Sequence, residues 1–551
     1  MKNIIIGILI VLLVASGFMA YTYYGKYDQL SDILRADYYT DLSVINQASH
    51  KGVNYLHQDG RWWIHVDDAM NLIDQDMYIS GSGQRVYIPF EHTALKLETR
   101  ELNDFVSTYA KSINLPLMEK DNRKWLDLEL LGKVYGFTHQ VYVETGVHQI
   151  WTIEQDVPVV QVTKNAKMLS AKSGPSLGLG QVPSGTMAIE LYAENDASYI
   201  LTGTGDLGWV ESSKVTKRDS TQGQVQPLRS LRRGKDIPEP LHLAWQQVST
   251  FAGNPDLVKT PLEEGINILS PTWFNLNVDG IVLNLADPQV VDKLHQAEAK
   301  VWPIFKNNFD PDWTQELLAS PDLQNRVIAQ LLVYNALYDI DGINFDFENM
   351  YLADKEGYAS FVQKASHLLD QQQMVSSVDV TVPWGSDMWS KVYDRPALAQ
   401  AVDFVMLMAY DEYWASSQKT GSVASEPWVR RGIEESLDLI PREKLILGFP
   451  FYARVWTTQS SGKVSSKAVG FNTQQKILKE NNLQASFDPN TGQNFVVYTL
   501  GGEKKEIWLE DETSVRMRAK LVKEYDLPGL AAWSRSFGHQ EVWNWIQSEL
   551  E

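Results

Sequence analysis

The chain has no cysteine among its 551 residues, which excludes disulfide bonds, thiolate catalysis and zinc or iron–sulfur sites with cysteine ligands. Positive charge is also scarce, because Lys and Arg number 49 against 69 Asp and Glu, and the net charge is −20. A surface this acidic repels polyanions, so we expect no nucleic acid among the partners. Hydrophobic residues make up 44% and charged residues 21%, which is typical of packed globular domains rather than of a disordered chain.

A long stretch near the start of the chain is also without charge. The stretch from Ile4 to Ala20 carries none, and the next charged residue is Lys26. About 20 apolar residues can cross a bilayer, and no clear small-residue cleavage site follows the stretch. We therefore predict that residues 1–26 form a single-pass anchor in the cell membrane, with the remainder outside the cell. The alternative is a cleaved signal peptide and a secreted protein, and the lack of cysteine suits a bacterial cell surface in both cases.

Residues 27–156 mix short amphipathic helices with alternating strands, which predicts a small α+β domain. Two stretches look like imperfect copies of one unit, Trp62–Met70 and Lys124–Leu131. This region resembles, loosely, the stalk domain found beside a copper amine oxidase-like N-terminal family. The resemblance carries no catalytic motif, so we expect a spacer.

Residues 157–216 are punctuated by Gly and Ser and predict a small β-barrel. The segment Ala197–Val210 has the pattern of a strand, a Gly-rich turn and a returning strand, and it resembles the closing hairpin of bacterial SH3-like domains. Residues 217–240 are polar and basic and end in two prolines, a composition that cannot bury a core. We expect this stretch to be a linker.

The remaining residues, 241–551, alternate apolar strands with helical patterns, which is typical of βα units. The predicted strands are Leu241–Gln246, Gly265–Ser270, Lys300–Phe305, Gly342–Glu348, Val378–Val382, Phe404–Ala409, Leu445–Phe449 and Gly529–Trp533. Eight strands separated by helices predict a (β/α)₈ TIM barrel. The interval before the last strand is long and holds alternating runs, so we expect a small α+β insertion with antiparallel strands there.

The fourth predicted strand carries the chemistry. It reads Asp341-Gly-Ile-Asn-Phe-Asp-Phe-Glu348, and alternation sends Asn344, Asp346 and Glu348 to one face. In a barrel strand the apolar face packs against helices, so the polar face points inward. Two neighbouring inward carboxylates repel, and burial adds to the effect, so one pKa should rise. A raised-pKa Glu348 at the carboxyl end of the strand is a candidate general acid.

Two non-catalytic explanations of this segment fit less well. A calcium loop would place its carboxylates on a turn with Gly at the bend, whereas these alternate with large apolar residues. A solvent-facing acidic strand would not need Ile and Phe on its other face. We therefore expect no metal and no cofactor.

This segment resembles the DxxDxDxE signature of glycoside hydrolase family 18, and three further motifs follow in the order of that family. Met406–Asp411 resembles the sixth-strand motif, Gly448–Arg454 resembles the seventh-strand segment, and Trp533 takes the place of the eighth-strand tryptophan. Short segments such as Ser270–Phe274 further resemble the branch of that family that contains bacterial spore and cell-wall hydrolases.

The resemblance implies a retaining mechanism in which the 2-acetamido group of the substrate is the nucleophile. Glu348 would protonate the glycosidic oxygen, Asp346 would orient the acetamido N–H, and the Tyr410 hydroxyl would hold its carbonyl oxygen. Trp533 would stack beneath the sugar.

The other family positions imply substrate-binding roles. Met408 would line the pocket, and Asp411 would reach a sugar hydroxyl. Asp341 belongs to the same set and would anchor the start of the strand. Asn344 stands where the family has Asp, a departure that we expect to simplify the titration of Asp346.

Together these features predict a membrane-anchored glycosidase that cleaves β-1,4 bonds after N-acetylglucosamine, in peptidoglycan. One alternative is a chitinase, with the same chemistry on another polymer. The other is a carbohydrate-binding protein without activity, although the presence of Glu348 favours an enzyme.

Overall fold

The computed structural model describes residues 32–220, 222–228 and 235–551. The chain forms two compact units, each described here by itself. The first takes in the chain to Met77, His92–Leu95 and Glu119–Gln226, and the second takes in Tyr78–Glu91, Lys96–Met118 and Pro227–Glu551. The division cuts through the predicted α+β domain of residues 27–156, so part of that segment folds with the C-terminal region.

The two similar stretches noted in the sequence are two strand–helix units. Strand β4 (Arg61–His65) leads into helix α2 (Val66–Leu72), and β9 (Arg123–Asp127) leads into α4 (Leu128–Tyr135). The two strands pair with each other, antiparallel, in the four-stranded sheet β3-β4-β9-β8. The other strands of this part are β1 (Leu42–Ile45), β2 (Ala48–Lys51), β3 (Tyr55–Gln58), β8 (Met118–Lys120), β10 (Phe137–Val141) and β11 (His148–Thr152).

An all-β region follows, where a small barrel is predicted. Seven strands form one sheet in the order β14-β13-β17-β16-β15-β12-β18. They are β12 (Val159–Val162), β13 (Ala166–Leu169), β14 (Gly178–Val182), β15 (Met187–Glu194), β16 (Ala197–Thr202), β17 (Leu207–Glu211) and β18 (Val215–Lys217). Strands β16 and β17 are the predicted hairpin. An SH3-like classification of this sheet stays a prediction.

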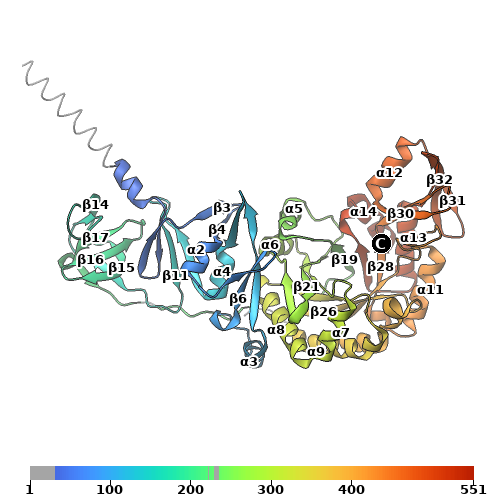
Figure 1. Cartoon of the computed structure of the whole chain (residues 1–551), viewed down its shortest axis with the longest axis horizontal. Helices are drawn as coiled ribbons and strands as arrows, with labels where there is room; N and C mark the ends of the chain where they lie inside the picture. The colour runs from blue at the N-terminus through green and yellow to red at the C-terminus, as the bar shows by residue number, and fades with distance from the viewer. Residues whose placement is uncertain (1–31, 221, 229–234) are drawn as a thin grey trace, which may run out of the picture. The chain divides into compact units, whose positions relative to one another are not determined.

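The second unit contains the predicted barrel (Figure 1). Its strands pair in parallel, and β34 closes the ring by pairing with both β28 and β19. They are β19 (Leu241–Gln246), β20 (Ile268–Pro271), β23 (Lys300–Val301) with β24 (Ile304–Lys306), β25 (Gly342–Asp346), β26 (Val375–Thr381), β27 (Phe404–Met408), β28 (Leu445–Pro450) and β34 (Gly529–Trp533). The third barrel strand is in two pieces because Pro303, which has no N–H to donate, lies between them.

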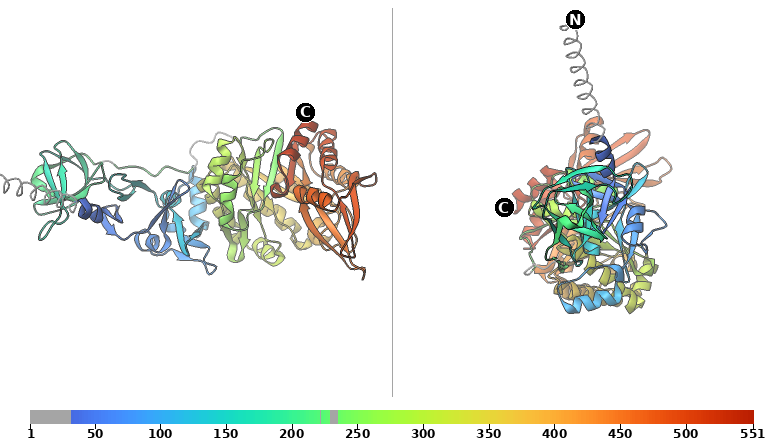
Figure 2. Two further views of the ribbon diagram at one scale, coloured as in Figure 1. Left: turned by 90° about the horizontal axis from the view of Figure 1, so that it is seen from above. Right: turned by 90° about the vertical axis from the view of Figure 1, so that its left-hand side faces the viewer.

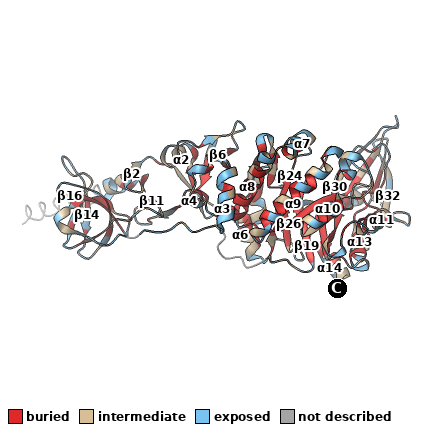
Figure 3. Ribbon diagram, turned by 90° about the horizontal axis from the view of Figure 1, so that it is seen from below, coloured by how far each residue is buried: buried red, intermediate tan, exposed pale blue. Residues whose placement is uncertain are grey.

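Helices cover the outside of these strands, with their inner faces buried and their outer faces exposed (Figure 3). They are α5 (Asn254–Lys259), α6 (Pro288–Gln296), α7 (Pro311–Ala319), α8 (Pro321–Tyr338), α9 (Lys355–Gln371), α10 (Arg395–Ala401), α11 (Glu426–Leu437), α13 (Glu512–Glu524) and α14 (Gln540–Leu550). Residues of alternate strand positions, among them Leu243, Ile304 and Met406, fill the barrel interior. The (β/α)₈ prediction is confirmed.

Two insertions decorate the barrel. A hairpin of β21 (Phe274–Asn277) and β22 (Ile281–Asn284) follows β20. The expected insertion before the last strand is a five-stranded antiparallel sheet with one helix, drawn in orange and red in Figures 1 and 2. It comprises β29 (Tyr452–Thr458), β30 (Val464–Gly470), α12 (Phe471–Glu480), β31 (Ser486–Asp488), β32 (Gln493–Leu500) and β33 (Glu503–Trp508).

A segment from far upstream completes the second unit. It holds the sheet β5-β6-β7, made of β5 (Tyr78–Ile79), β6 (Arg85–Pro89) and β7 (Ser112–Pro116), and the helix α3 (Arg100–Tyr109). Asn284 of β22 donates two hydrogen bonds of 3.1 Å to Asn114 of β7, from its backbone N–H to the Asn114 Oδ1 and from its side-chain amide to the Asn114 carbonyl. The Asn114 amide also donates to the Val282 carbonyl at 2.8 Å, and its backbone N–H donates to the Tyr334 hydroxyl at 2.9 Å.

The predicted membrane anchor is not supported. No helix in the part of the chain that the structure describes is both long and apolar enough to cross a bilayer. The longest of them, α8, has 18 residues, but it carries Asp322 and Arg326 and is a barrel helix. The prediction of a single-pass cell-membrane location is therefore corrected. The stretch from Ile4 to Ala20, on which it was based, lies outside the described residues.

Candidate active site

The alternation predicted for the fourth barrel strand is present. Ile343, Phe345 and Phe347 are fully buried, and the last two pack against Phe361 and Tyr358 of α9. Asn344 and Asp346 therefore point into the barrel, and Glu348 follows just beyond the end of β25 at the carboxyl edge. This is the edge where TIM-barrel active sites lie.

The backbone around Glu348 is held by neighbouring elements. Asn307, directly after β24, accepts from the Glu348 N–H at 3.1 Å and donates to the Glu348 carbonyl at 2.7 Å. The Tyr393 hydroxyl donates to the Phe347 carbonyl at 2.9 Å. The side chain of Glu348, the predicted general acid, therefore rises from a fixed backbone.

The electrostatic surroundings favour a protonated Glu348. Burial in the barrel mouth raises its pKa well above the ordinary value, and the negative charges of Asp346 and Asp411 raise it further, while Lys306 opposes them. Such a carboxyl keeps its proton to higher pH than an ordinary glutamate does, which suits a general acid. The predicted rise of one pKa in the carboxylate pair has this cause.

Asp346 has a different environment. Lys306 is its partner across the β24–β25 ladder, and the positive charge of Lys306 offsets part of the cost of burial. The pKa of Asp346 is raised to about 6, so its carboxyl is ionised at neutral pH. Its Oδ1 is buried and has no hydrogen-bond partner among the described residues, so this oxygen lacks a donor.

Asn344 lies one step deeper and is fully buried. Its Oδ1 accepts from the indole N–H of Trp245 at 2.7 Å, and its amide donates to Asp379 Oδ1 at 2.8 Å. Asp379 belongs to the neighbouring strand β26 and is 2% exposed. The expected simplification of the Asp346 titration therefore does not follow, because the barrel places a different carboxyl in this region.

Asp379, Lys306 and Asn307 are site residues that the sequence reasoning missed. For Asp379 a signal was available, since Ser377, Asp379 and Thr381 alternate with valines in β26 and so face inward. For the other two, the signal is only their place at the end of a barrel strand.

Three predicted residues lie at the ends of other strands. Met408 and Trp533 are the last residues of β27 and β34, and Tyr410 follows β27. The Tyr410 and Trp533 side chains are partly buried against the barrel interior, so each keeps a surface toward the mouth. The structure thus brings them to the same edge as Glu348 and Asp346.

Asp411 is held by the insertion. Its Oδ1 accepts from the Tyr452 hydroxyl at 2.7 Å and from the Arg454 guanidinium at 2.9 Å. Its charge is one of those that raise the pKa of Glu348. Asp411 is therefore part of this edge.

Asp341 is not brought together with the others. It precedes β25 at the opposite end of the strand from Glu348, where Oδ2 accepts from the Val301 N–H at 2.9 Å and lies 2.8 Å from His295 Nε2. This arrangement fits the predicted anchoring of the strand start and places Asp341 away from the substrate-binding edge.

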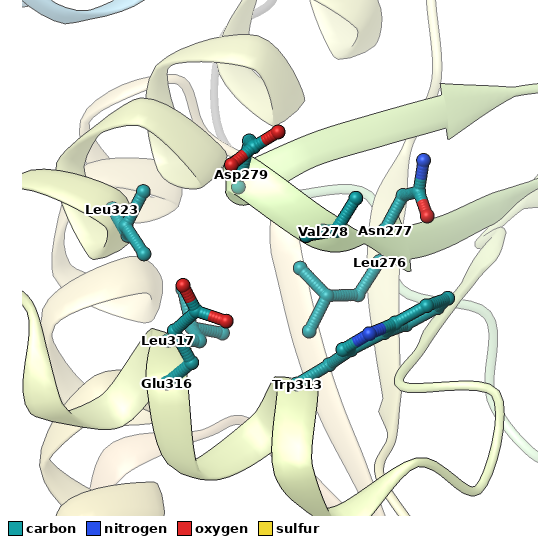
Figure 4. A pocket seen from close by; sticks show the side chains of 9 residues that line it. Leu276, Asn277, Val278, Asp279, Trp313, Glu316, Leu317 and Leu323 are labelled. Carbon is teal, nitrogen blue, oxygen red and sulfur yellow. The ribbon is translucent and has the colours of Figure 1, made fainter.

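Two other places could attract a ligand. Asp74, Asp76 and His92 of the first unit lie close enough to share a cation, but His92 and Asp74 are already paired at 3.1 Å. A small pocket in the second unit is lined by Leu276 and Val278 beside the β21–β22 turn and by Leu317 and Leu323 of α7 and α8 (Figure 4). It contains none of the predicted site residues.

Comparisons with known proteins identify the domain that contains these residues. Residues 308–538 match the family model described as Glycosyl hydrolases family 18. The cortical fragment-lytic enzyme of Bacillus subtilis is 27% identical over 316 residues, which cover 56% of this chain and 71% of the relative. The uncharacterized glycosylase YvbX of Bacillus subtilis is 24% identical over 294 residues, which cover 51% of this chain and 84% of the relative.

Solved structures share the fold. The Bacillus cereus spore cortex-lytic enzyme SleL aligns with a TM-score of 0.53 at 20% identity, covering 58% of this chain and 76% of that chain. A chitinase from Chromobacterium violaceum aligns with a TM-score of 0.51 at 21% identity, covering 56% of this chain and 98% of that chain. The chain therefore carries a glycoside hydrolase family 18 domain, and the protein is a glycoside hydrolase related to cortex-lytic enzymes and chitinases.

Proposed function

We propose that this protein hydrolyses β-1,4 bonds after N-acetylglucosamine in peptidoglycan, with the substrate acetamido group as the nucleophile. The observation that carries the proposal is the difference in pKa between two carboxyls of one strand. The pKa of Glu348 at the barrel mouth is raised well above its ordinary value, whereas Asp346, two residues earlier on the same face, is ionised at neutral pH.

The chemistry proceeds in two displacements at the same carbon. Glu348 gives its proton to the glycosidic oxygen as the C1–O bond breaks, and the acetamido carbonyl oxygen attacks C1 to form an oxazolinium ion. Asp346 accepts a hydrogen bond from the acetamido N–H and stabilises the positive charge, and the Tyr410 hydroxyl holds the carbonyl oxygen. Water, deprotonated by Glu348, then opens the ring, and configuration at C1 is retained.

The choice of peptidoglycan over chitin is supported by relatives. The cortical fragment-lytic enzyme of Bacillus subtilis matches over 56% of the chain, and the Bacillus cereus spore cortex-lytic enzyme shares the fold over 58% of it. Chitinases share the fold, so chitin is the second candidate. A role restricted to sugar binding would leave the proton held on Glu348 without a use.

Product analysis separates these functions. The full chain is incubated with purified peptidoglycan and with chitin oligomers, the new reducing ends are reduced with borohydride, and the products are measured by mass spectrometry. We expect peptidoglycan fragments with reduced N-acetylglucosamine at their ends. Products that end in N-acetylmuramic acid, or turnover of chitin alone, would contradict the proposal.

The substrate-assisted route has its own measurement. Proton NMR at early times should show the β-anomer of the released sugar, because two displacements restore the starting configuration. A thiazoline mimic of the oxazolinium ion should inhibit, since stable mimics of high-energy states bind more tightly than substrates. Initial release of the α-anomer would indicate direct attack by water instead.

A further inference from the structure

Three inward-facing side chains form a row across neighbouring strands of the barrel. Lys306 of β24 pairs with Asp346 of β25. On the other side the register runs Asn344 to Ser377 and Phe345 to Val378, so the next position sets Asp346 beside Asp379 of β26. Paired positions of parallel strands lie about 4.8 Å apart and point to the same face. The side chains of Lys306, Asp346 and Asp379 thus leave neighbouring backbone positions on the same face.

The orientation of the Asn344 amide determines whether Asp379 donates or accepts in the hydrogen bond between them. The indole of Trp245 can only donate, so the Asn344 oxygen faces Trp245 and the Asn344 NH₂ faces Asp379. Asp379 Oδ1 is therefore an acceptor in this contact. Its second oxygen is the one that can carry a proton.

The charges of the row decide where that proton lies. Two neighbouring carboxyls in a buried site cannot both ionise without strong repulsion. Lys306 stands on the Asp346 side, so the negative charge is better placed on Asp346. Burial and the charges of Asp346 and Glu348 raise the pKa of Asp379 well above its ordinary value, while the Asn344 hydrogen bond opposes them. The other titratable groups that face it are the phenols of Tyr358 on α9 and Tyr410 after β27.

We propose that Asp379 is a positioning residue that holds one proton beside Asp346 and so keeps Asp346 as the anion of the pair. Asn344 has no carboxyl, and Asp379 supplies one from the neighbouring strand β26. The proton stays within the pair, and Asp379 forms no bond to the substrate. This inference rests on the proposed function, in which the Asp346 anion receives the acetamido N–H.

The presence of the proton can be tested without activity. A carboxyl that stays neutral in the folded state but ionises in the unfolded chain makes the folded state less stable as pH rises above the ordinary pKa. The side chain of Asp379→Asn cannot ionise. The melting temperature of the variant minus that of the wild type should therefore increase by about 3 °C or more between pH 4.5 and pH 7. Asp438→Asn, at the exposed end of α11, is the matched control and should show no growing gap.

The effect on Asp346 is tested by kinetics. A carboxyl O–H donates a stronger hydrogen bond to a carboxylate than an amide does. Asp379→Asn should therefore move the acid limb of the kcat profile to higher pH, with kcat about tenfold lower near pH 5 and KM changed less than about twofold. The double variant Asn344→Asp with Asp379→Asn returns the carboxyl to β25 and exchanges donor and acceptor in the same contact. It should restore the wild-type limb.

The outcomes are distinct. A gap that does not grow with pH would overturn the protonated state of Asp379. An unmoved acid limb in Asp379→Asn would overturn its effect on Asp346, since Asn preserves the hydrogen bond from Asn344 and a purely structural role would survive. If the wild type cleaved neither polymer, the proposed function would fail, while the stability measurement would still decide where the proton lies.

Discussion

The role proposed for Glu348 follows from its position rather than from its residue type. Many glutamates in the chain are exposed, and this one is set apart by a buried barrel mouth, two neighbouring negative charges and a backbone held by Asn307. The same surroundings that disfavour its ionisation favour the proposed role of proton donor. A site of this kind costs stability and supplies reactivity.

Replacing Glu348 with Gln tests the acid directly. Glutamine keeps the size and the hydrogen-bonding capacity but has no proton to transfer, and general acid catalysis is worth about 10²–10⁴-fold. We expect hydrolysis of N-acetylglucosamine polymers to fall by at least about 100-fold, measured by the release of reducing ends, with an unchanged circular dichroism spectrum. Near-full activity in this variant would remove Glu348 from the mechanism.

The two pKa directions predict the pH dependence of kcat. Asp346 must be ionised, so activity should rise as pH increases through about 6. Glu348 must be protonated, and because its pKa is raised well above normal, the loss of activity should come only on the alkaline side. A bell-shaped curve with its maximum above pH 6 is expected when rates are measured across pH 4–10. A maximum well below pH 5 would contradict this assignment.

At the scale of elements, strand order and strand direction could be predicted from the sequence. All eight predicted barrel strands occur, two of them, Leu241–Gln246 and Gly529–Trp533, with the predicted bounds. Alternation along β25 also predicted the inward carboxylates. What alternation cannot supply is the register between strands, and without it neither the place of Asp379 beside Asp346 nor the contact of Asn307 with the Glu348 backbone could be foreseen.

The end of β24 offers a test at this scale. Replacing Asn307 with Ala removes both hydrogen bonds that hold the Glu348 backbone, and small displacements of a catalytic group are costly. We expect kcat to fall about tenfold or more, with KM changed far less, in steady-state assays on chitin oligomers or peptidoglycan. Asn307→Asp, which keeps only the acceptor, should lie between the two. Equal loss through KM would indicate a substrate contact instead.

At the scale of the whole molecule, the boundaries of the compact units do not follow the order of the sequence. Residues 78–118 were predicted as part of an N-terminal spacer, yet most of them fold with the barrel. The reason is a set of buried polar contacts between β7 and β22, which join Asn114 to Val282 and Asn284. Side-chain amides that pair over such a distance in sequence leave no local pattern, so composition alone placed the boundary at residue 240.

The Asn114→Ala variant measures how much the junction formed by the contacts between β7 and β22 contributes to the stability of the folded chain. The change leaves the Val282 carbonyl and the Asn284 N–H without their partner, and an unsatisfied buried group costs about 1–3 kcal/mol. We expect a clear fall in the melting temperature of the full chain by calorimetry. Ser112→Ala, at the start of the same strand, serves as the control and should change it little. An unaltered melting temperature in Asn114→Ala would mean that the junction contributes nothing to the fold.

The junction also sets a timetable for synthesis. Asn114 of β7 leaves the ribosome 170 residues before Asn284 of β22, and at about 5–20 residues per second this is a delay on the order of ten to thirty seconds. During that interval Asn114 has neither Val282 nor Asn284 to pair with. The nascent chain must therefore keep the edge of β7 hydrated. Strand β7 can pack against the barrel only after β20 and the β21–β22 hairpin have been made.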